Sequence, residues 1–217
     1  MGTVTSTRLR DTVYAKLRKQ IITGKLMPGE LLNDSSLMRE FGVGRTPLRE
    51  AMILLNNDGL ARSYPRRGTF VTEVTLAALQ KALEIRPSLE ALAIRLGVQY
   101  ATDQELAALK KASESSTEGY APDEVLEFDF DIHKTIVELS RNEYLFDAWI
   151  KVYTACSRLK YLSLSPVQDR DIIQGQLYAI ASAMAARDVK GAITLMEEHL
   201  AHFIRSVGLF GTELPSN

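Results

Sequence analysis

The stretch GVGRTPLRE, residues 42–50, joins two short amphipathic segments and decides the fold of the first part of the chain. Its two glycines predict a tight turn, because glycine tolerates the positive φ angle that often ends a helix. One helix is expected over residues 35–41, before this turn. A second helix is expected after Thr46, which can cap it, with Pro47 in its first turn and an end near Asp58.

A basic β-hairpin is predicted after the second helix. Residues 61–64 and 69–72 have the composition of short strands, and the Pro-Arg-Arg-Gly sequence at 65–68 is typical of the turn between them. An amphipathic helix over residues 9–22 precedes these elements. Helix, tight turn, helix and hairpin in this order predict a winged helix-turn-helix, which we assign to residues 1–74.

The arginines of this module have the chemistry of DNA recognition. Arg45 and Arg49 are predicted to project from the N-terminal end of the second helix, where a guanidinium can pair with O6 and N7 of guanine. The Thr46 hydroxyl and the N–H groups of that helix end suit phosphate oxygens. A solvated charged face is the plain alternative. The predicted DNA-binding set is Arg45, Thr46, Arg49, Arg66, Arg67 and Gly68.

The net charge of the chain changes sign along its length. Residues 1–74 hold 12 Lys+Arg against 7 Asp+Glu, whereas residues 75–217 hold 14 against 20. A basic front and an acidic rear indicate a module that binds a polyanion, joined to a module that does not. Chance imbalance between two ordinary domains would produce the same contrast.

Composition excludes several classes of protein. With 46% hydrophobic residues the chain can bury a core rather than remain disordered. No apolar run approaches the roughly 20 residues that a membrane helix needs, and the N-terminus does not resemble a secretion signal. Cys156 is the only cysteine, which excludes an internal disulfide framework. We therefore expect a cytoplasmic protein with no membrane partner.

The rest of the chain, residues 75–217, has an almost wholly helical pattern. Its connections are short, so the helices are expected to pack as an antiparallel all-α bundle. The fold class is thus mainly α, with one small hairpin in the first domain. The six helices are expected over residues 76–96, 103–114, 123–140, 144–164, 166–187 and 189–207.

One group of polar residues stands out on the inward faces of these helices. Asp129 and His133 are four residues apart and share a helix face that is bordered by apolar side chains. His199 lies on a second inward stripe. Together they can form a site for zinc or a similar divalent metal with carboxylate and imidazole ligands. A buried Asp–His hydrogen bond with an unrelated second histidine is the alternative.

The N-terminal module resembles the DNA-binding domain of GntR-type bacterial transcription regulators. The resemblance covers about residues 8–74 and lies in the segments PGELL, VGRTPLREAM, DGL and PRRGTFV. It implies that Arg45, Thr46, Arg49 and Gly68 contact operator DNA. Because one recognition helix reads only a few base pairs, a homodimer on a two-fold symmetric site is expected.

The rear module is similar to FCD, the helical effector domain of the FadR-type subgroup, in its six-helix, VanR-like variant. The similar segments are EIRPSLEALAIRL, FDIHKTIVELSRNEYL and AARDVKGAITLMEEHL. Many such domains bind a metal through one aspartate and three histidines. Asp129, His133 and His199 match three of these ligands, whereas Leu177 stands at the position of the fourth, so the resemblance implies a site with one imidazole fewer.

A small anionic effector, such as a carboxylate, is the expected ligand of the rear module. Arg86 matches an arginine typical of the subgroup and can pair with an effector carboxylate, or else with Glu90 one helical turn away. Arg158 and Arg170 are further candidate cations. We therefore expect an effector-responsive DNA-binding regulator. A metal-dependent hydrolase built on the Asp–His cluster and an effector-free architectural DNA-binding protein are alternatives, although no HExxH, nucleophile elbow or phosphate loop supports an enzyme.

Overall fold

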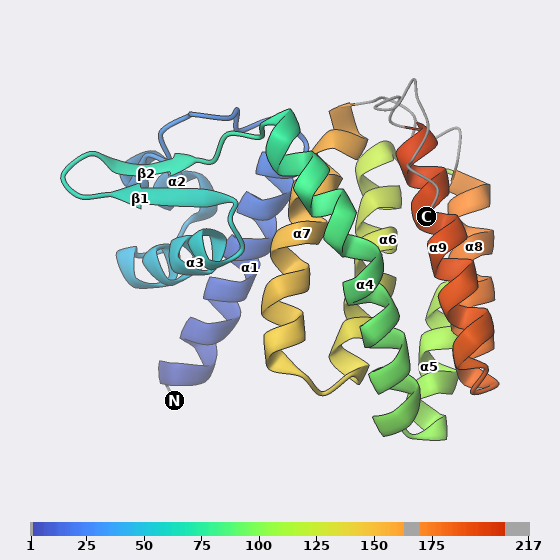
Figure 1. Ribbon diagram of the computed structural model, residues 1–217. Helices are drawn as coiled ribbons and strands as arrows, with labels where there is room; N and C mark the ends of the chain where they lie inside the picture. Colours follow the sequence, from blue (N-terminus) through green and yellow to red (C-terminus); the bar gives the residue numbers. More distant parts are fainter. Residues whose placement is uncertain (1, 163–169, 207–217) are drawn as a thin grey trace. The chain divides into compact units, whose positions relative to one another are not determined.

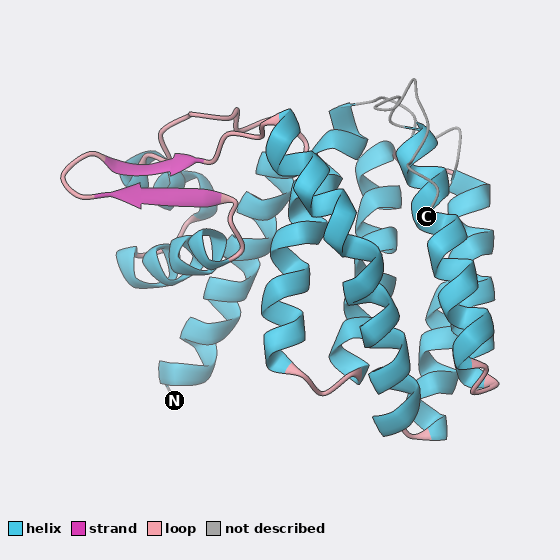
Figure 2. Ribbon diagram, viewed as in Figure 1, coloured by secondary structure: helices cyan, strands magenta, loops and turns pink. Residues whose placement is uncertain are grey.

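The structure is a computed structural model that describes the backbone of residues 2–162 and 170–206 and the side chains of 8–158 and 170–205. The chain divides into two compact units, Met1–Gln80 and Lys81–Asn217. Within the described residues the elements are helices and one small hairpin (Figures 1 and 2). None of the described helices is apolar over a length that could span a membrane.

The first unit contains three helices and a hairpin, in the order predicted. Apolar residues of α1 and α3 pack together, with Leu17 and Leu48 fully buried. Asn33 caps α2 by accepting a hydrogen bond from the Ser36 N–H at 2.9 Å, and Gly42 ends α2 with a φ of 64°. The elements are α1 (Gly2–Ile22), α2 (Asp34–Phe41), α3 (Arg45–Asn57), β1 (Ala61–Tyr64) and β2 (Gly68–Val71).

The N-terminus of α3 differs from the prediction. The N-cap is Gly44, with extended φ and ψ, and the helix begins at Arg45. Thr46 is therefore the second residue of the helix and not its cap. Pro47 still lies within the first turn, where the missing N–H has no helical partner to lose. The capping prediction for Thr46 was wrong because glycine adopts the cap conformation without contributing a side-chain bond.

The hairpin is built on a proline turn. The Arg67 N–H donates to the Tyr64 carbonyl at 3.1 Å, and Arg66 has a φ of 61°, which is typical of a turn with proline at its first central position. Gly68 has a φ of 101°, and a Cβ there would lie 2.8 Å from Leu31 Cδ1. Leu31 forms a β-bridge with Phe70 on the outer edge of β2. The backbone conformation thus favours glycine at position 68, and a Cβ there would also displace the end of the Leu31 side chain.

The second unit is an all-helical bundle in which consecutive helices run in opposite directions (Figure 1). The predicted helices are confirmed with boundaries shifted by a few residues, except that the expected ends at Leu164 and Val207 and the expected start at Pro166 lie outside the described residues. Trp149, Ile136 and Met184 are among its fully buried core side chains. The helices are α4 (Leu76–Tyr100), α5 (Asp103–Ser113), α6 (Pro122–Leu139), α7 (Glu143–Leu162), α8 (Arg170–Ala185) and α9 (Val189–Ser206).

Candidate functional site

The N-terminal end of α3 presents an exposed polar face. Arg45, Thr46 and Arg49 are all exposed, whereas Leu48 between them is fully buried. Arg45 and Arg49 are four residues apart, so their side chains lie on one helix face. Ile53 follows one turn later and is 60% exposed. An exposed apolar side chain on such a face can contact a thymine methyl group.

The hairpin adds a second basic element. Arg66 and Arg67 lie exposed at its tip, and Arg62, which the sequence analysis did not select, is exposed on β1. The Ser63 N–H donates to the Asn56 side chain at 3.4 Å, which connects the C-terminal end of α3 with β1. This hydrogen bond joins the hairpin directly to α3. Their arrangement suits major-groove reading by α3 and backbone contacts by the hairpin.

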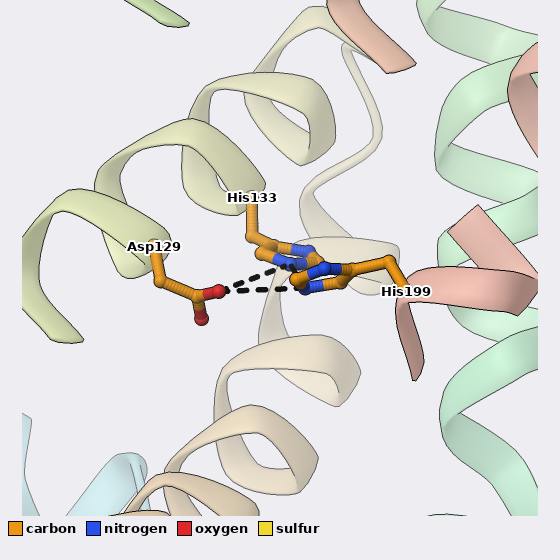
Figure 3. A group of neighbouring side chains, drawn as sticks. All are labelled: Asp129, His133 and His199. Carbon is orange, nitrogen blue, oxygen red and sulfur yellow. Dashed lines mark hydrogen bonds and ion pairs between the residues drawn. The ribbon is translucent and has the colours of Figure 1, made fainter. Parts of the chain in front are cut away.

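Asp129, His133 and His199 meet inside the helical unit (Figure 3). The first two come from α6 and the third from α9. His199 Nε2 lies 3.4 Å from Asp129 Oδ1, and His133 Nε2 lies 4.0 Å from the same oxygen. The two Nε2 atoms are 3.2 Å apart. All three residues are at most 2% exposed, so the expected grouping is present and buried.

Each histidine has an acceptor beside its other ring nitrogen. His199 Nδ1 lies 3.0 Å from Gln176 Oε1 on α8. His133 Nδ1 lies 3.0 Å from Glu90 Oε1 on α4, an ion-pair contact that does not have the angles of a hydrogen bond. An acceptor next to Nδ1 favours the tautomer with the proton on Nδ1. The lone pair of each ring is then on Nε2, which is the atom that faces the cluster.

With both ring protons on Nδ1, the facing atoms of the cluster each offer a lone pair. The Tyr153 hydroxyl donates to Asp129 Oδ2 at 2.6 Å, so Oδ1 is the carboxylate oxygen next to the rings. The carboxylate and the two Nε2 atoms lie within 4.8 Å of one another. A cation shared by the three atoms would be stabilised by a lone pair from each of them. One carboxylate and two imidazoles fit zinc or a similar divalent ion.

Glu90 is the carboxylate behind His133. Its Oε1 accepts a hydrogen bond from Trp149 Nε1 at 2.9 Å, and its Oε2 has no hydrogen-bond partner among the described residues. Burial alone would raise the pKa of Glu90, but His133, Arg86 and Trp149 together outweigh burial and lower that pKa. Glu90 is therefore ionised at neutral pH, as an acceptor for the His133 proton requires.

Arg86 lies one turn before Glu90 on α4 and is 4% exposed. Its Nε is 3.4 Å from Glu90 Oε1, and its guanidinium carbon lies 4.8 Å and 5.4 Å from the ring centres of Tyr153 and Phe203. Burial alone would lower the pKa of Arg86, but the neighbouring Cys156 and Glu90 outweigh burial and raise that pKa. The intrahelical ion pair, which was the alternative to effector binding by Arg86, is present, and burial strengthens the attraction between its two charges.

The remaining predicted residues lie in three different settings. Arg158 is buried in α7, with 5% of its surface exposed. Arg170 begins α8, and its Nε lies 3.5 Å from Asp171 of the same helix. Leu177 is fully buried in the apolar core and contributes no ligand atom. Its neighbour Gln176 instead supports His199 from the side, a role that helical spacing did not reveal.

Two family models match the chain, one over each part. Residues 9–71 match the gntR family of bacterial regulatory proteins, and residues 81–202 match the FCD domain. The FCD match covers more than half of the chain. The chain therefore belongs to the GntR family and carries an FCD domain, which makes it a DNA-binding transcription regulator and not an enzyme.

Individual relatives are also named as transcription regulators. The chain is 35% identical over 136 residues to YdhC, an uncharacterized HTH-type transcriptional regulator of Bacillus subtilis, a match that spans 61% of each protein. It is 25% identical over 202 residues to the HTH-type transcriptional repressor RspR of Escherichia coli, covering 92% of this chain and 89% of RspR. The solved structure of E. coli McbR/YncC has the same fold, with a TM-score of 0.76, 24% identity, and coverage of 92% and 97%.

Proposed function

We propose that this regulator acts in the cytoplasm as a homodimer whose operator binding responds to a small carboxylate effector. The effector binds in the helical unit beside a divalent metal held by Asp129, His133 and His199. The convergence of three buried ligand atoms within 4.8 Å of one another carries this proposal, because a bound cation can take a lone pair from each of them. With Leu177 in place of a fourth protein ligand, water or effector oxygens complete the metal shell.

The balance of buried charge favours an effector that binds only with the metal. Among the described residues of the helical unit, the buried ions are Arg86, Arg158, Glu90 and Asp129, and their formal charges cancel. With neutral histidines, a divalent cation leaves a net positive charge in a dry environment. A carboxylate neutralises that charge, and the metal supplies a Lewis-acidic contact to one of its oxygens.

An unsatisfied atom refines the choice of effector. Glu90 Oε2 is fully buried and has no hydrogen-bond partner among the described residues. A buried carboxylate oxygen is stabilised by a donor, which a hydroxyl group of the ligand supplies. Sugar acids and other hydroxy-carboxylates therefore suit the site better than plain carboxylates.

Because the site is buried among several helices, effector binding can change how those helices are arranged. The cluster and its supporting residues come from α4, α6, α7, α8 and α9. A ligand that reaches atoms with almost no exposed surface must shift some of these helices. It alters DNA binding by favouring one relative arrangement of the two DNA-binding units. A typical coupling of about 1–3 kcal/mol changes operator affinity by about 5–150-fold.

The contacts with operator DNA are divided between the two basic elements. Arg45 and Arg49 read base edges in the major groove, and Thr46 and the N–H groups at the start of α3 bind phosphate. Arg66 and Arg67 contact the backbone or the minor groove, where Gly68 lets the strand approach.

A thermal-shift screen tests the proposal. Small carboxylates, sugar acids and acyl-CoA compounds are each added with zinc and, separately, with a chelator. A ligand present at about 100 times its Kd stabilises the protein by about 2.7 kcal/mol, and we expect this only with zinc. The His199→Gln variant should lose the zinc-dependent shift, while the neighbouring exposed Glu198→Gln control retains it. Equal shifts in zinc and in chelator would contradict the metal-linked site.

A further inference from the structure

The outer face of α4 carries an apolar stripe that no described residue covers completely. Ile85, Leu92 and Tyr100 are 47%, 38% and 52% exposed. Leu89 and Leu96 are partly buried and complete the stripe. The spacing from Ile85 to Leu96 is four, three and four residues, which keeps the side chains on one face of a helix and matches the repeat of a coiled-coil seam.

The stripe is symmetric about its own centre. Reversing the direction of the helix about the point between Glu90 and Ala91 exchanges Ile85 with Leu96 and Leu89 with Leu92. Two copies of α4 packed antiparallel about a two-fold axis at this point would therefore place each apolar side chain against another. Such self-complementarity is what an isologous interface requires.

The charges beside the stripe follow the same symmetry. Glu84 and Arg95 are exposed, and neither forms an ion pair with any described residue. At 100° per residue both lie on the same flank of the stripe, near its opposite ends. In the antiparallel pair this flank meets the same flank of the second copy, so Glu84 lies close to Arg95 of the second copy. In a parallel pair, like residues would lie at the same level.

We infer that the α4 stripe Ile85–Leu89–Leu92–Leu96 is the homodimer interface. In this dimer α4 packs antiparallel against α4 of a second copy. Glu84 then pairs with Arg95 of the second copy across the two-fold axis. The inference rests on the proposed homodimer and adds to it a surface, a direction and a register. The pairing also sets Lys81 against Tyr100 of the second copy, where a cation–π contact is favourable.

Charge reversal tests the pairing with little risk to the fold, because both charged residues are exposed. Analytical ultracentrifugation should show that Glu84→Arg raises the dimer Kd about tenfold or more, since it turns two attractive pairs into repulsive ones. The double variant Glu84→Arg/Arg95→Glu should restore the parent Kd to within about threefold. Glu197→Arg, the same change at an exposed position on α9, is the matched control and should leave the dimer Kd unchanged.

Cysteine cross-linking tests the direction. Ile85→Cys chains mixed with Leu96→Cys chains should form a disulfide-linked dimer, whereas each variant alone should not. In the antiparallel register the two Ile85 positions lie about 16 Å apart along the helix axes, beyond disulfide reach. The native Cys156 is buried and does not interfere.

The outcomes separate the inference from the proposed function. Self-linking of Ile85→Cys would establish parallel packing and overturn the register. A dimer Kd that Glu84→Arg leaves unchanged would place the seam elsewhere, while the homodimer itself would stand. A parent chain that sediments as a monomer would overturn both.

Discussion

The buried ion pair between Arg86 and Glu90 gives the sharpest test of how the helical unit is held together. Replacing Arg86 by Met leaves the fully buried Glu90 carboxylate without its arginine partner. Removing one member of a buried pair typically costs about 3–5 kcal/mol, because the remaining charge stays in a dry environment. We expect Arg86→Met and Glu90→Gln each to destabilise the helical unit by about that amount.

The double variant Arg86→Met/Glu90→Gln should recover part of the loss, since neither charge then remains unpaired. We expect it to be less destabilised than the sum of the single variants by about 2 kcal/mol or more. Trp149 is the only tryptophan and lies in the helical unit, so its fluorescence during urea unfolding reports on this unit. With an m-value of about 1–3 kcal/mol/M, a loss of about 3 kcal/mol moves the midpoint by about 1–3 M. Single-variant costs that add to within about 0.5 kcal/mol would refute the coupling.

The Arg86–Glu90 pair also predicts how the stability of the folded protein depends on pH. The pKa of Glu90 is lowered in the folded protein from its ordinary value of 4.5. The stabilisation that its ionised form provides is therefore complete above about pH 4.5 and is lost as the pH falls through the folded-state value. With chelator present throughout, the stability gap between the parent and Glu90→Gln should narrow below about pH 4.5. A gap that widens on acidification would contradict the assigned direction.

Three further predictions concern the two sites. Gly68→Ala should destabilise the first unit by about 1–3 kcal/mol, because alanine disfavours the positive φ and its Cβ meets Leu31; unchanged thermal unfolding would show that the hairpin relaxes instead. Arg45→Ala should weaken binding to a specific operator by about 1–3 kcal/mol and relax base preference. Arg67→Ala should weaken binding to all sequences and reduce the slope of log binding constant against log salt concentration by about one. Fluorescence anisotropy in a salt series measures both effects. His199→Gln should lower bound zinc well below the parent stoichiometry by plasma emission spectrometry after dialysis; full occupancy would remove His199 from the metal site.

Local sequence signals were sufficient for the helices and the hairpin. The helical periodicity placed six helices in the second unit, and the predicted boundaries that fall on described residues lie within a few residues of those observed. The Pro-Arg-Arg-Gly turn was equally clear, because proline and glycine each restrict or permit a specific backbone angle. The error at Thr46 arose because threonine and glycine both favour a helix cap and local sequence does not choose between neighbours.

The candidate metal site was only partly accessible from sequence. Asp129 and His133 were found because both lie on one helix, one turn apart, where spacing alone defines a shared face. His199 was selected as an inward-facing histidine, but its distance from the pair depends on how α9 packs against α6. Glu90 was expected as the partner of Arg86, yet its contact with His133 joins α4 to α6.

The sequence by itself determined the elements, their order, the basic face of α3 and the inward position of the Asp–His pair, because each of these depends on residues close together in the chain. Only the tertiary structure decided that Gln176, rather than Leu177, supports His199, and that Tyr153 orients Asp129. These contacts join residues 23 and 24 positions apart, across different helices. Their geometry is set by helix packing, which the periodicity of one helix does not encode.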